Sequence, residues 1–304
     1  MREGLIDKEN INMAKAIIRL ALQEDLEPLG DLSSLLTIDS NKKATAQIIA
    51  KEPGVMACGW IIKNILETYA EARSFNIELY FQDSDSFKAG DVLCQIKAPA
   101  QTLLACERTI LNFLQRLCGI ASYTHGLVNL IKDYPCKLLD TRKTMPGMRS
   151  LEKEAFRCGG GTNHRFNLSD MVMLKENHLA CIEGDLTTKI KQIRATLNGQ
   201  RSTEKVKIEV EINKDNLDKL DTVIQAGIDV VMLDNFSPAE ATELIKLIRS
   251  KSIGHSTLGI ELSGGINKAN LVDYAKALPD YISTGSATTK ANNLDLSMLI
   301  TNLT

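Results

Sequence analysis

A chain of 304 residues with 44% hydrophobic and 24% charged side chains excludes a disordered protein and indicates two domains, or one barrel carrying an additional module. Its formal net charge of -2 gives no overall attraction for nucleic acid or an anionic membrane, so an anionic ligand requires a local cluster of cations. Seven cysteines without a CxxC pair indicate free thiols in a reducing compartment, and without a signal-like or bilayer-length apolar run we expect a cytoplasmic protein with no membrane partner.

The N-terminal part of the chain has the pattern of a small α+β layer. Helical or strand-like spacing of apolar residues predicts helices over 10–26 and 60–70, and strands over 46–50, 77–81 and 92–96. Residues 88–91 have the composition of a turn before the last of these strands. A long helical pattern follows over 102–131, and we expect Gly119 and Gly126 to interrupt it.

After this helix, short apolar strands alternate with helices. The expected strands cover 137–141, 171–175, 206–212, 229–234, 258–262 and 281–284. Such alternation is typical of a parallel sheet that is closed, or nearly closed, into a barrel. Because the pattern contains six strong strands rather than eight, it fits a partial barrel as well as a complete one.

Basic residues are concentrated after the first two of these strands. The cluster contains Arg142, Lys143, Arg149, Arg157, His164, Arg165 and Lys175. From Arg142 to Lys175 there are seven lysines or arginines and three acidic residues, and we expect 152–154 to lie on an exposed helix. Ligands of parallel αβ folds bind at the carboxyl ends of the strands, and the guanidinium fork of arginine fits a planar carboxylate. We therefore interpret Arg142 and Lys143 as anion-binding residues rather than as solvated surface charges.

Acidic residues lie on the next two strands. Glu209 and Glu211 alternate on the third strand, and Asp234 ends the fourth. Carboxylate oxygens suit Mg²⁺ that is shared with substrate phosphates, and a buried ion pair with the nearby cations is an equally compatible interpretation. We select Glu211 over Glu209 because it lies nearer the carboxyl end of its strand.

Glycine-containing turns follow the last two strands. The candidate phosphate ligands there are Ser263, Gly264, Gly265, Gly285 and Ser286. Glycine lets backbone N–H groups approach a phosphate closely, and barrels commonly bind a phosphate after their last two strands.

In this order, the segments resemble the quinolinate phosphoribosyltransferase family. The resemblance lies in DTRKTMPGMRSLEKEAFRCGGGTNHR at 140–165, followed by LKENH, EVEI, MLDNF, ELSGGI and STGSAT. It extends upstream through GDLSS at 30–34, KEPGV at 51–55 and ERTILNFLQ at 107–115, so it covers most of the chain.

The resemblance implies a mixed α/β fold, an incomplete αβ (TIM-like) barrel with an N-terminal α+β sandwich domain. Residues 1–115 would form the N-terminal domain, 116–290 the catalytic barrel, and 291–304 a helix packing back on the N-terminal domain. The family pattern also implies a homodimer with shared active sites, in which the N-terminal domain covers the partner's barrel and Arg108 enters the partner's site.

The implied activity is a glycosyltransferase reaction of NAD biosynthesis. Quinolinate and phosphoribosyl pyrophosphate would give nicotinate mononucleotide, pyrophosphate and CO₂, with Mg²⁺ as the cofactor. The quinolinate ligands on the family pattern are Arg108, Arg142, His164, Arg165 and Lys175. Lys143 would lie between the two substrates, while Glu211 and Asp234 would contact the ribose and the metal, directly or through water. These three residues are the expected catalytic groups.

Two other functions remain open at this point. Lys143 or Lys175 at a strand end could form a Schiff base, as in a barrel lyase. The same cations would also serve a non-catalytic sensor of an anionic nucleotide. Within the family, another pyridine carboxylate is a possible substrate, and Thr289 stands where some relatives have a histidine.

Overall fold

The computed structural model describes residues 8–70, 74–199, 206–251 and 258–303. The chain forms two compact units. The sheet unit consists of Arg2–Gly126, Lys143–Gly161 and Ala287–Thr304, and the barrel unit consists essentially of Leu127–Arg142 and Thr162–Ser286. We expected the N-terminal domain to end at residue 115, whereas the sheet unit continues to Gly126. The sheet unit also includes two later segments, Lys143–Gly161 and Ala287–Thr304.

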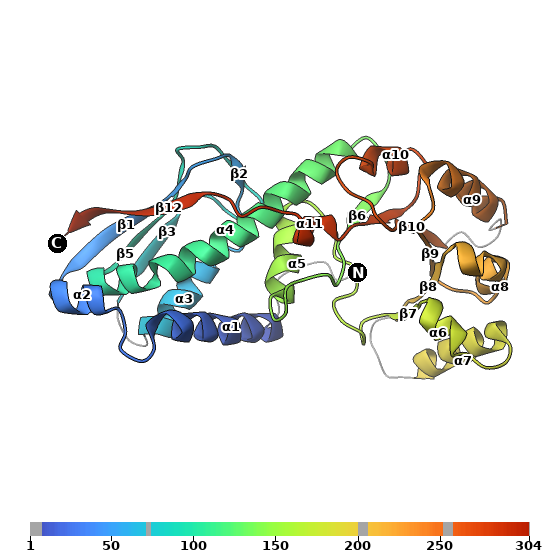
Figure 1. Ribbon diagram of the computed structural model, residues 1–304, viewed down its shortest axis with the longest axis horizontal. Coiled ribbons are helices and arrows are strands. Elements are labelled where there is room, and N and C mark those ends of the chain that lie inside the picture. Colours follow the sequence, from blue (N-terminus) through green and yellow to red (C-terminus); the bar gives the residue numbers. More distant parts are fainter. Residues whose placement is uncertain (1–7, 71–73, 200–205, 252–257, 304) are drawn as a thin grey trace. The chain divides into compact units, whose positions relative to one another are not determined.

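The sheet unit contains a four-stranded antiparallel sheet in the order β12-β1-β5-β3. Its strands are β1 (Lys43–Ala50), β3 (Asn76–Leu79), β5 (Val92–Pro99) and β12 (Leu296–Leu303), and β2 (Gly54–Val55) pairs with β4 (Ser86–Phe87). Its helices are α1 (Lys8–Leu26), α2 (Leu32–Thr37), α3 (Ile61–Ala70), α4 (Ala100–Leu130, continuing past the unit) and α5 (Arg149–Cys158). Alternate residues of β1 are buried, as expected of a strand with one face on the core. Figure 1 shows α3 and α4 beside this sheet.

The C-terminal segment differs from the expectation. We expected a helix over 291–304, but β12 is a strand that pairs antiparallel with β1, for example Ile48 with Met298. Leu296 and Met298 are buried, so the segment does pack back on the N-terminal domain. The open edge of β1 offers backbone donors and acceptors, and a strand satisfies them where a helix would not.

Helix α4 is continuous through both glycines that we expected to interrupt it. A Cβ added to Gly119 would overlap the backbone oxygen of Asn292, whereas one added to Gly126 would meet nothing within 4 Å. Gly119 therefore allows a close approach of two chain segments, and α4 is not broken there because packing outweighs the weak helix propensity of glycine.

The barrel unit is built on a six-stranded sheet in the order β6-β11-β10-β9-β8-β7, and every pairing in it is parallel. Its strands are β6 (Lys137–Leu139), β7 (Val172–Leu174), β8 (Ile208–Ile212), β9 (Val230–Asp234), β10 (Gly259–Ser263) and β11 (Tyr281–Ser283). Its helices are α6 (Glu176–Ala180), α7 (Leu186–Gly199), η1 (Lys214–Lys219), α8 (Leu220–Gln225), α9 (Pro238–Lys251), α10 (Leu271–Ala275) and the start of α11 (Ser286–Thr289). All six predicted strands are present. In the described part of the chain β6 and β7 are edge strands, so the barrel is incomplete.

Burial of the sheet on both faces explains the apolar strands. Four of the five residues of β9 and three of the five of β10 are buried. Parallel order places the carboxyl ends of all six strands at one edge, which carries most of the candidate residues.

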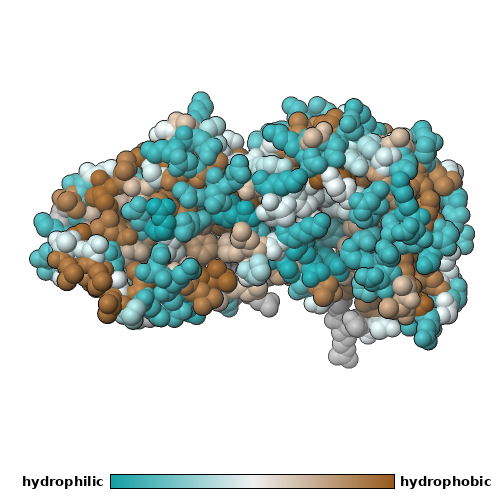
Figure 2. Space-filling view, viewed as in Figure 1, coloured by the Kyte–Doolittle hydropathy of each residue, from teal (hydrophilic) through white to brown (hydrophobic). Residues whose placement is uncertain are grey.

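The surface over α2 is apolar in the view of Figure 2. The side chains of Leu32, Leu35 and Leu36 are 50%, 51% and 81% exposed. Several exposed leucines on one short helix are a feature of protein interfaces.

The cysteines are free thiols, as expected, and all except the exposed Cys181 are buried. Burial raises the pKa of Cys94 and of Cys106 to about 12. Among the described residues, no helix combines the length and apolar character needed to cross a membrane.

Candidate active site

The carboxyl edge of the barrel sheet carries most of the predicted site residues. Those in the barrel unit are Arg142, His164, Arg165, Lys175, Glu211, Asp234, Ser263, Gly264, Gly265, Gly285 and Ser286. Lys143 and Arg108 belong to the sheet unit, and both are exposed.

Two arginines lie near each other at this edge. Partial burial lowers the pKa of Arg165, and the positive charge of Arg142 lowers it further. Arg165 Nη1 donates to the Met171 carbonyl at 3.3 Å. The Nε–H of Arg142 is buried and has no hydrogen-bond acceptor among the residues that the structure describes. A buried donor without an acceptor costs about 1–3 kcal/mol, so this pair of cations is ready to bind an anion.

Lys175 forms an ion pair with Glu211 through Nζ and Oε2. Their side chains are 42% and 13% exposed, so the pair lies at the border between the sheet and solvent. The sequence left open whether the acidic strand residues pair with the nearby cations, and Glu211 does form such an ion pair, with Lys175.

Asp234 ends β9 directly beside Ser263 at the end of β10. The Asn235 amide donates to the Ser263 carbonyl at 3.1 Å, and Asn235 Nδ2 donates to Asp234 Oδ2 at 2.6 Å. Gly264 has φ +94°, and a Cβ there would overlap Asn235. Glycine is therefore required at Gly264, because the turn has a left-handed backbone and lies against the acidic strand end.

The second glycine turn is held by its own hydrogen bonds. Thr284 Oγ1 donates to the Ile266 carbonyl at 2.6 Å, and it accepts from the Ser286 amide at 3.1 Å. The hydroxyl groups of Thr284 and Ser286 are 2.8 Å apart. These hydrogen bonds fix the conformation of the turn.

Beneath the basic edge, His164 contacts two buried glutamates. His164 Nε2 lies 3.3 Å from Glu209 and 3.3 Å from Glu261, and these three side chains are 8%, 1% and 2% exposed. The Asp140 carboxylate accepts from the His164 amide at 2.8 Å, and His164 Nδ1 accepts from the Arg165 amide at 2.7 Å. The contact at Nδ1 leaves Nε2 as the ring nitrogen that faces the two carboxylates.

Within this cluster the pKa values of His164 and Glu209 are higher than those of the same side chains in water. Burial raises the pKa of Glu209 to about 7, and the charge of Glu261 raises it in the same direction. Burial lowers the pKa of His164, but hydrogen bonds and charges of Glu209 and Glu261 more than offset this and raise it to about 10.

The atoms of this cluster lie within 4.8 Å of one another, which is close enough to hold a metal ion. A proton on Nε2 removes that nitrogen as a ligand, so the geometry favours a proton-bridged group.

The sequence did not reveal this group. From the sequence alone we select Glu211 over Glu209 and do not single out Glu261. A usable signal was present, since Glu261 lies two residues before Ser263 and so shares its face of β10.

The prediction that 152–154 lies on an exposed helix is wrong. Glu152, Lys153 and Glu154 on α5 are 0%, 2% and 9% exposed. Arg116 pairs with Glu152 at 2.7 Å and Arg157 pairs with Glu154 at 2.5 Å. Charged residues on a helix predict exposure to solvent only where no opposite charge packs against them. Here Arg116 on α4 packs against Glu152.

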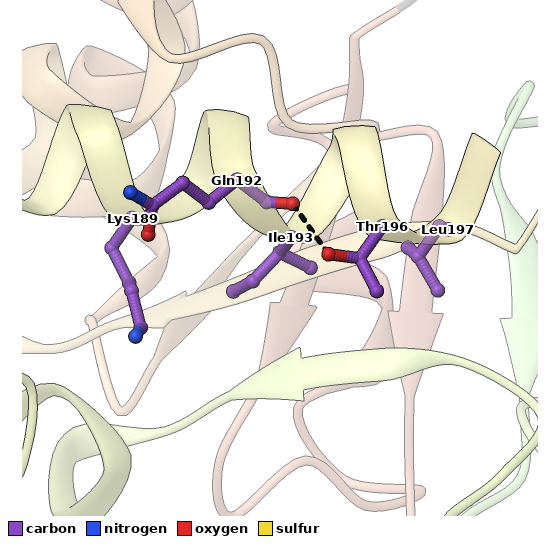
Figure 3. A pocket seen from close by; sticks show the side chains of 5 residues that line it. All are labelled: Lys189, Gln192, Ile193, Thr196 and Leu197. Atoms are coloured by element: carbon purple, nitrogen blue, oxygen red, sulfur yellow. Dashed lines mark hydrogen bonds between the residues drawn. The ribbon is translucent and has the colours of Figure 1, made fainter. Parts of the chain in front are cut away.

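A surface hollow on α7 lies apart from these residues. It is lined by Lys189, Gln192, Ile193, Thr196 and Leu197, which all belong to that one helix (Figure 3). Within it, Thr196 Oγ1 donates to the Gln192 carbonyl at 2.9 Å. None of the candidate site residues lines it.

Family models match both parts of the chain. Residues 31–118 match "Quinolinate phosphoribosyl transferase, N-terminal domain", and residues 120–299 match the C-terminal domain of the same name. The chain is 38% identical over 274 residues to a probable nicotinate-nucleotide pyrophosphorylase [carboxylating] of Bacillus subtilis, covering 90% of this chain and 88% of the relative. It is 32% identical over 285 residues to the nicotinate-nucleotide pyrophosphorylase [carboxylating] of Mycobacterium leprae, covering 94% and 96%.

Solved structures show the same fold. The nicotinate-nucleotide pyrophosphorylase of Francisella tularensis matches with a TM-score of 0.84 and 33% identity, covering 98% of this chain and 100% of that one. NadC from Streptococcus pyogenes matches with a TM-score of 0.84 and 35% identity, covering 99% of each chain.

Proposed function

The chain belongs to the quinolinate phosphoribosyltransferase family, and with its activity as a nicotinate-nucleotide pyrophosphorylase (carboxylating) as the premise we propose how its residues carry out the reaction. Quinolinate and phosphoribosyl pyrophosphate react to nicotinate mononucleotide, pyrophosphate and CO₂. The observation that carries the assignment of the site is the buried Nε–H of Arg142, which lies near the guanidinium of Arg165 and has no hydrogen-bond acceptor in the described part of the chain.

Quinolinate binds through its two carboxylates in this proposal. Arg142 and Arg165 supply paired donors, and His164 and Lys175 border the same edge. Each charge-assisted hydrogen bond contributes about 1.5–3 kcal/mol, which suits a small dianion that must displace water. Arg108 of a second subunit completes the pocket.

Phosphoribosyl transfer is a displacement at the anomeric carbon. The pyridine nitrogen attacks as pyrophosphate leaves, so positive charge develops on the ribose. Glu211 and Asp234 stabilise that charge, while Lys143 lies between the substrates and offsets the negative charge of the leaving group. The turns at Gly264–Gly265 and Gly285–Ser286 hold the phosphates. No side-chain nucleophile is required.

Mg²⁺ fits the donor set at this edge. Asp234 and Glu211 offer carboxylate oxygens at the ends of neighbouring strands, and Asp234 lies beside the glycine turn. Hard oxygen donors shared with phosphate oxygens are what Mg²⁺ prefers, and the bound ion supplies positive charge that favours departure of pyrophosphate. Asp234 and Glu211 would hold the ion there.

Decarboxylation follows from the chemistry of the product ring. Once the ring nitrogen carries the ribose it is quaternary and positively charged, so it stabilises the electron pair that stays on the adjacent ring carbon when the carboxylate departs as CO₂. That carbon then takes up a proton, from water or a protonated side chain at the site, which gives nicotinate mononucleotide. The residues around the ring need only hold it in place and limit access of water. No further cofactor is needed for this step.

We also propose that the protein is a cytoplasmic homodimer. The exposed leucines of α2 offer an apolar surface suited to a second copy of the chain, and the buried free thiols suit a reducing compartment. In this assembly Arg108 acts in the partner's site.

The direct test uses purified protein with quinolinate, phosphoribosyl pyrophosphate and Mg²⁺. We expect nicotinate mononucleotide and CO₂ in equal amounts, and both should fall to background when Mg²⁺ is chelated. Substrate turnover without CO₂ release would contradict the proposal. The Schiff-base alternative predicts borohydride trapping of a carbonyl substrate on Lys143 or Lys175, but the pairing of Lys175 with Glu211 suits a cation rather than an amine nucleophile. A non-catalytic sensor would bind both substrates without releasing pyrophosphate.

A further inference from the structure

Lys143 belongs to a closed ring of hydrogen bonds in the sheet unit. The Lys143 carbonyl accepts from Thr288 Oγ1 at 2.6 Å. The Thr288 carbonyl accepts from Arg116 Nη2 at 2.5 Å, and the guanidinium of Arg116 donates to Glu152 Oε1 at 2.7 Å and 3.0 Å. Glu152 Oε2 accepts from the Met145 amide at 3.2 Å, which returns the ring to the segment that carries Lys143.

The ring is protected from solvent. Glu152 is fully buried, the side chain of Arg116 is 13% exposed, and Thr288 is 6% exposed. Hydrogen bonds of a charged pair in such surroundings are strong, and removing one partner of a buried pair is strongly destabilising. The ring is therefore a rigid part of the unit.

The ring joins three segments that are distant in sequence. Arg116 lies on α4, Glu152 on α5, and Thr288 on α11, two residues after Ser286 of the proposed phosphate turn. A second bond from Arg116 to the Ala291 carbonyl, at 3.2 Å, fixes the chain that follows α11. The backbone after the phosphate turn is thus tied to the backbone of Lys143.

Lys143 needs such a support because its side chain is exposed. Packing does not hold an exposed lysine in one position, so the reach of its ammonium group is set in part by the position of its Cα. Displacement of a catalytic group by about 1 Å can cost on the order of 100-fold in rate.

We propose that Thr288, Arg116 and Glu152 are positioning residues for Lys143, whose backbone they hold in place through this ring. The inference rests on the proposed role of Lys143. It adds three residues that do not touch substrate and that the sequence did not single out.

The test replaces Thr288, because Thr288→Val removes one hydroxyl and keeps the shape of the side chain. Thr288→Ser retains the hydroxyl. Thr301→Val is the matched control, since Thr301 Oγ1 also donates to a backbone carbonyl of the sheet unit, that of Thr45 at 3.2 Å. Glu152→Gln, which keeps the shape but removes the charge facing Arg116, probes a second contact of the ring.

Two readouts are needed. In hydrogen–deuterium exchange of the whole protein, we expect faster exchange over residues 143–148 in Thr288→Val, and unchanged exchange there in Thr288→Ser and Thr301→Val. In steady-state kinetics, we expect kcat of Thr288→Val to fall about 10-fold or more, with KM for quinolinate changed less than about 3-fold. Thr288→Ser should return kcat to within about 3-fold of the wild type.

Faster exchange with an unchanged kcat would overturn the positioning role, as would an equal loss of kcat in Thr301→Val. Unchanged exchange over 143–148 in both Thr288→Val and Glu152→Gln would show that the ring does not hold this segment. A wild-type protein without transferase activity would instead overturn the proposed function, and the exchange data would still decide whether the ring holds the loop.

Discussion

Single residues at the barrel edge follow from their place after a strand. Arg142 follows β6, Lys175 follows β7, and Asp234 ends β9, so the structure places all three at ends of the strands that the sequence predicts. A polar residue directly after a buried strand is held by the sheet yet open to a ligand. The partners of these residues were not foreseeable, because the pairing of Lys175 with Glu211 joins positions 36 residues apart.

Lys143→Ala should separate catalysis from stability. Lys143 is exposed, so the substitution should change the melting temperature by less than about 2 °C. Loss of its charge beside the leaving pyrophosphate should lower kcat/KM by about 100-fold or more. Thermal unfolding and initial-rate measurements on the same preparation check this. Parallel losses of melting temperature and activity would show that Lys143 has a structural role.

Asp83 should make stability depend on pH. Burial raises its pKa above 3.8, and the charge of Glu154 raises it further, although Gly59 donates to Asp83 Oδ1 at 2.9 Å. The folded state therefore holds the proton more tightly than the unfolded state. The free energy of unfolding should fall as pH rises from the ordinary aspartate pKa through the raised one, and then level off.

Asp83→Asn keeps the acceptor for Gly59 and removes the charge. The difference in unfolding free energy between variant and wild type should therefore grow in favour of the variant as pH rises through this window. Urea unfolding from pH 4 to pH 8 measures it. A difference that does not vary with pH would mean that Asp83 is not desolvated.

At the scale of elements, helix α4 shows what the helical spacing of apolar residues predicts and what it does not. Its helical spacing predicts the element well, and only tertiary contact explains Gly119. Gly119→Ala places a methyl group against the Asn292 carbonyl and should destabilise the protein by about 1–3 kcal/mol. Gly126→Ala meets open space within the same helix and should stabilise by up to about 1 kcal/mol.

Chemical denaturation of the two glycine variants gives a direct comparison, because both make the same change in one helix. Equal effects would mean that helix propensity alone decides the outcome. The strand β12 makes the related point, since its residues became a strand through the edge of β1 rather than through their own pattern.

At the scale of the whole molecule, the proposed shared site can be tested by complementation. Arg108→Ala and Lys143→Ala should each be inactive, because each removes one contribution to every site. A mixed dimer of the two variants would contain one intact site, formed by Lys143 of one chain and Arg108 of the other. Random assembly of equal amounts should restore about a quarter of wild-type activity.

Co-expression of the two variants, with the subunit stoichiometry checked by sedimentation, measures this recovery. Activity that stays at the level of the single variants would place Arg108 and Lys143 in the same subunit's site. A monomeric wild-type protein that is fully active would exclude the shared site altogether.

The sequence by itself determined the order of the elements, the parallel sheet and the strand ends that carry Arg142, Lys175 and Asp234, because these follow from local spacing. Only the tertiary structure decided that His164 meets Glu209 and Glu261, that Arg116 buries Glu152 on α5, and that β12 completes the first sheet. The physical reason is the distance along the chain. These contacts join residues from 36 to more than 250 positions apart, and the free energy of a buried charge or an open strand edge depends on whichever distant partner the fold brings to it.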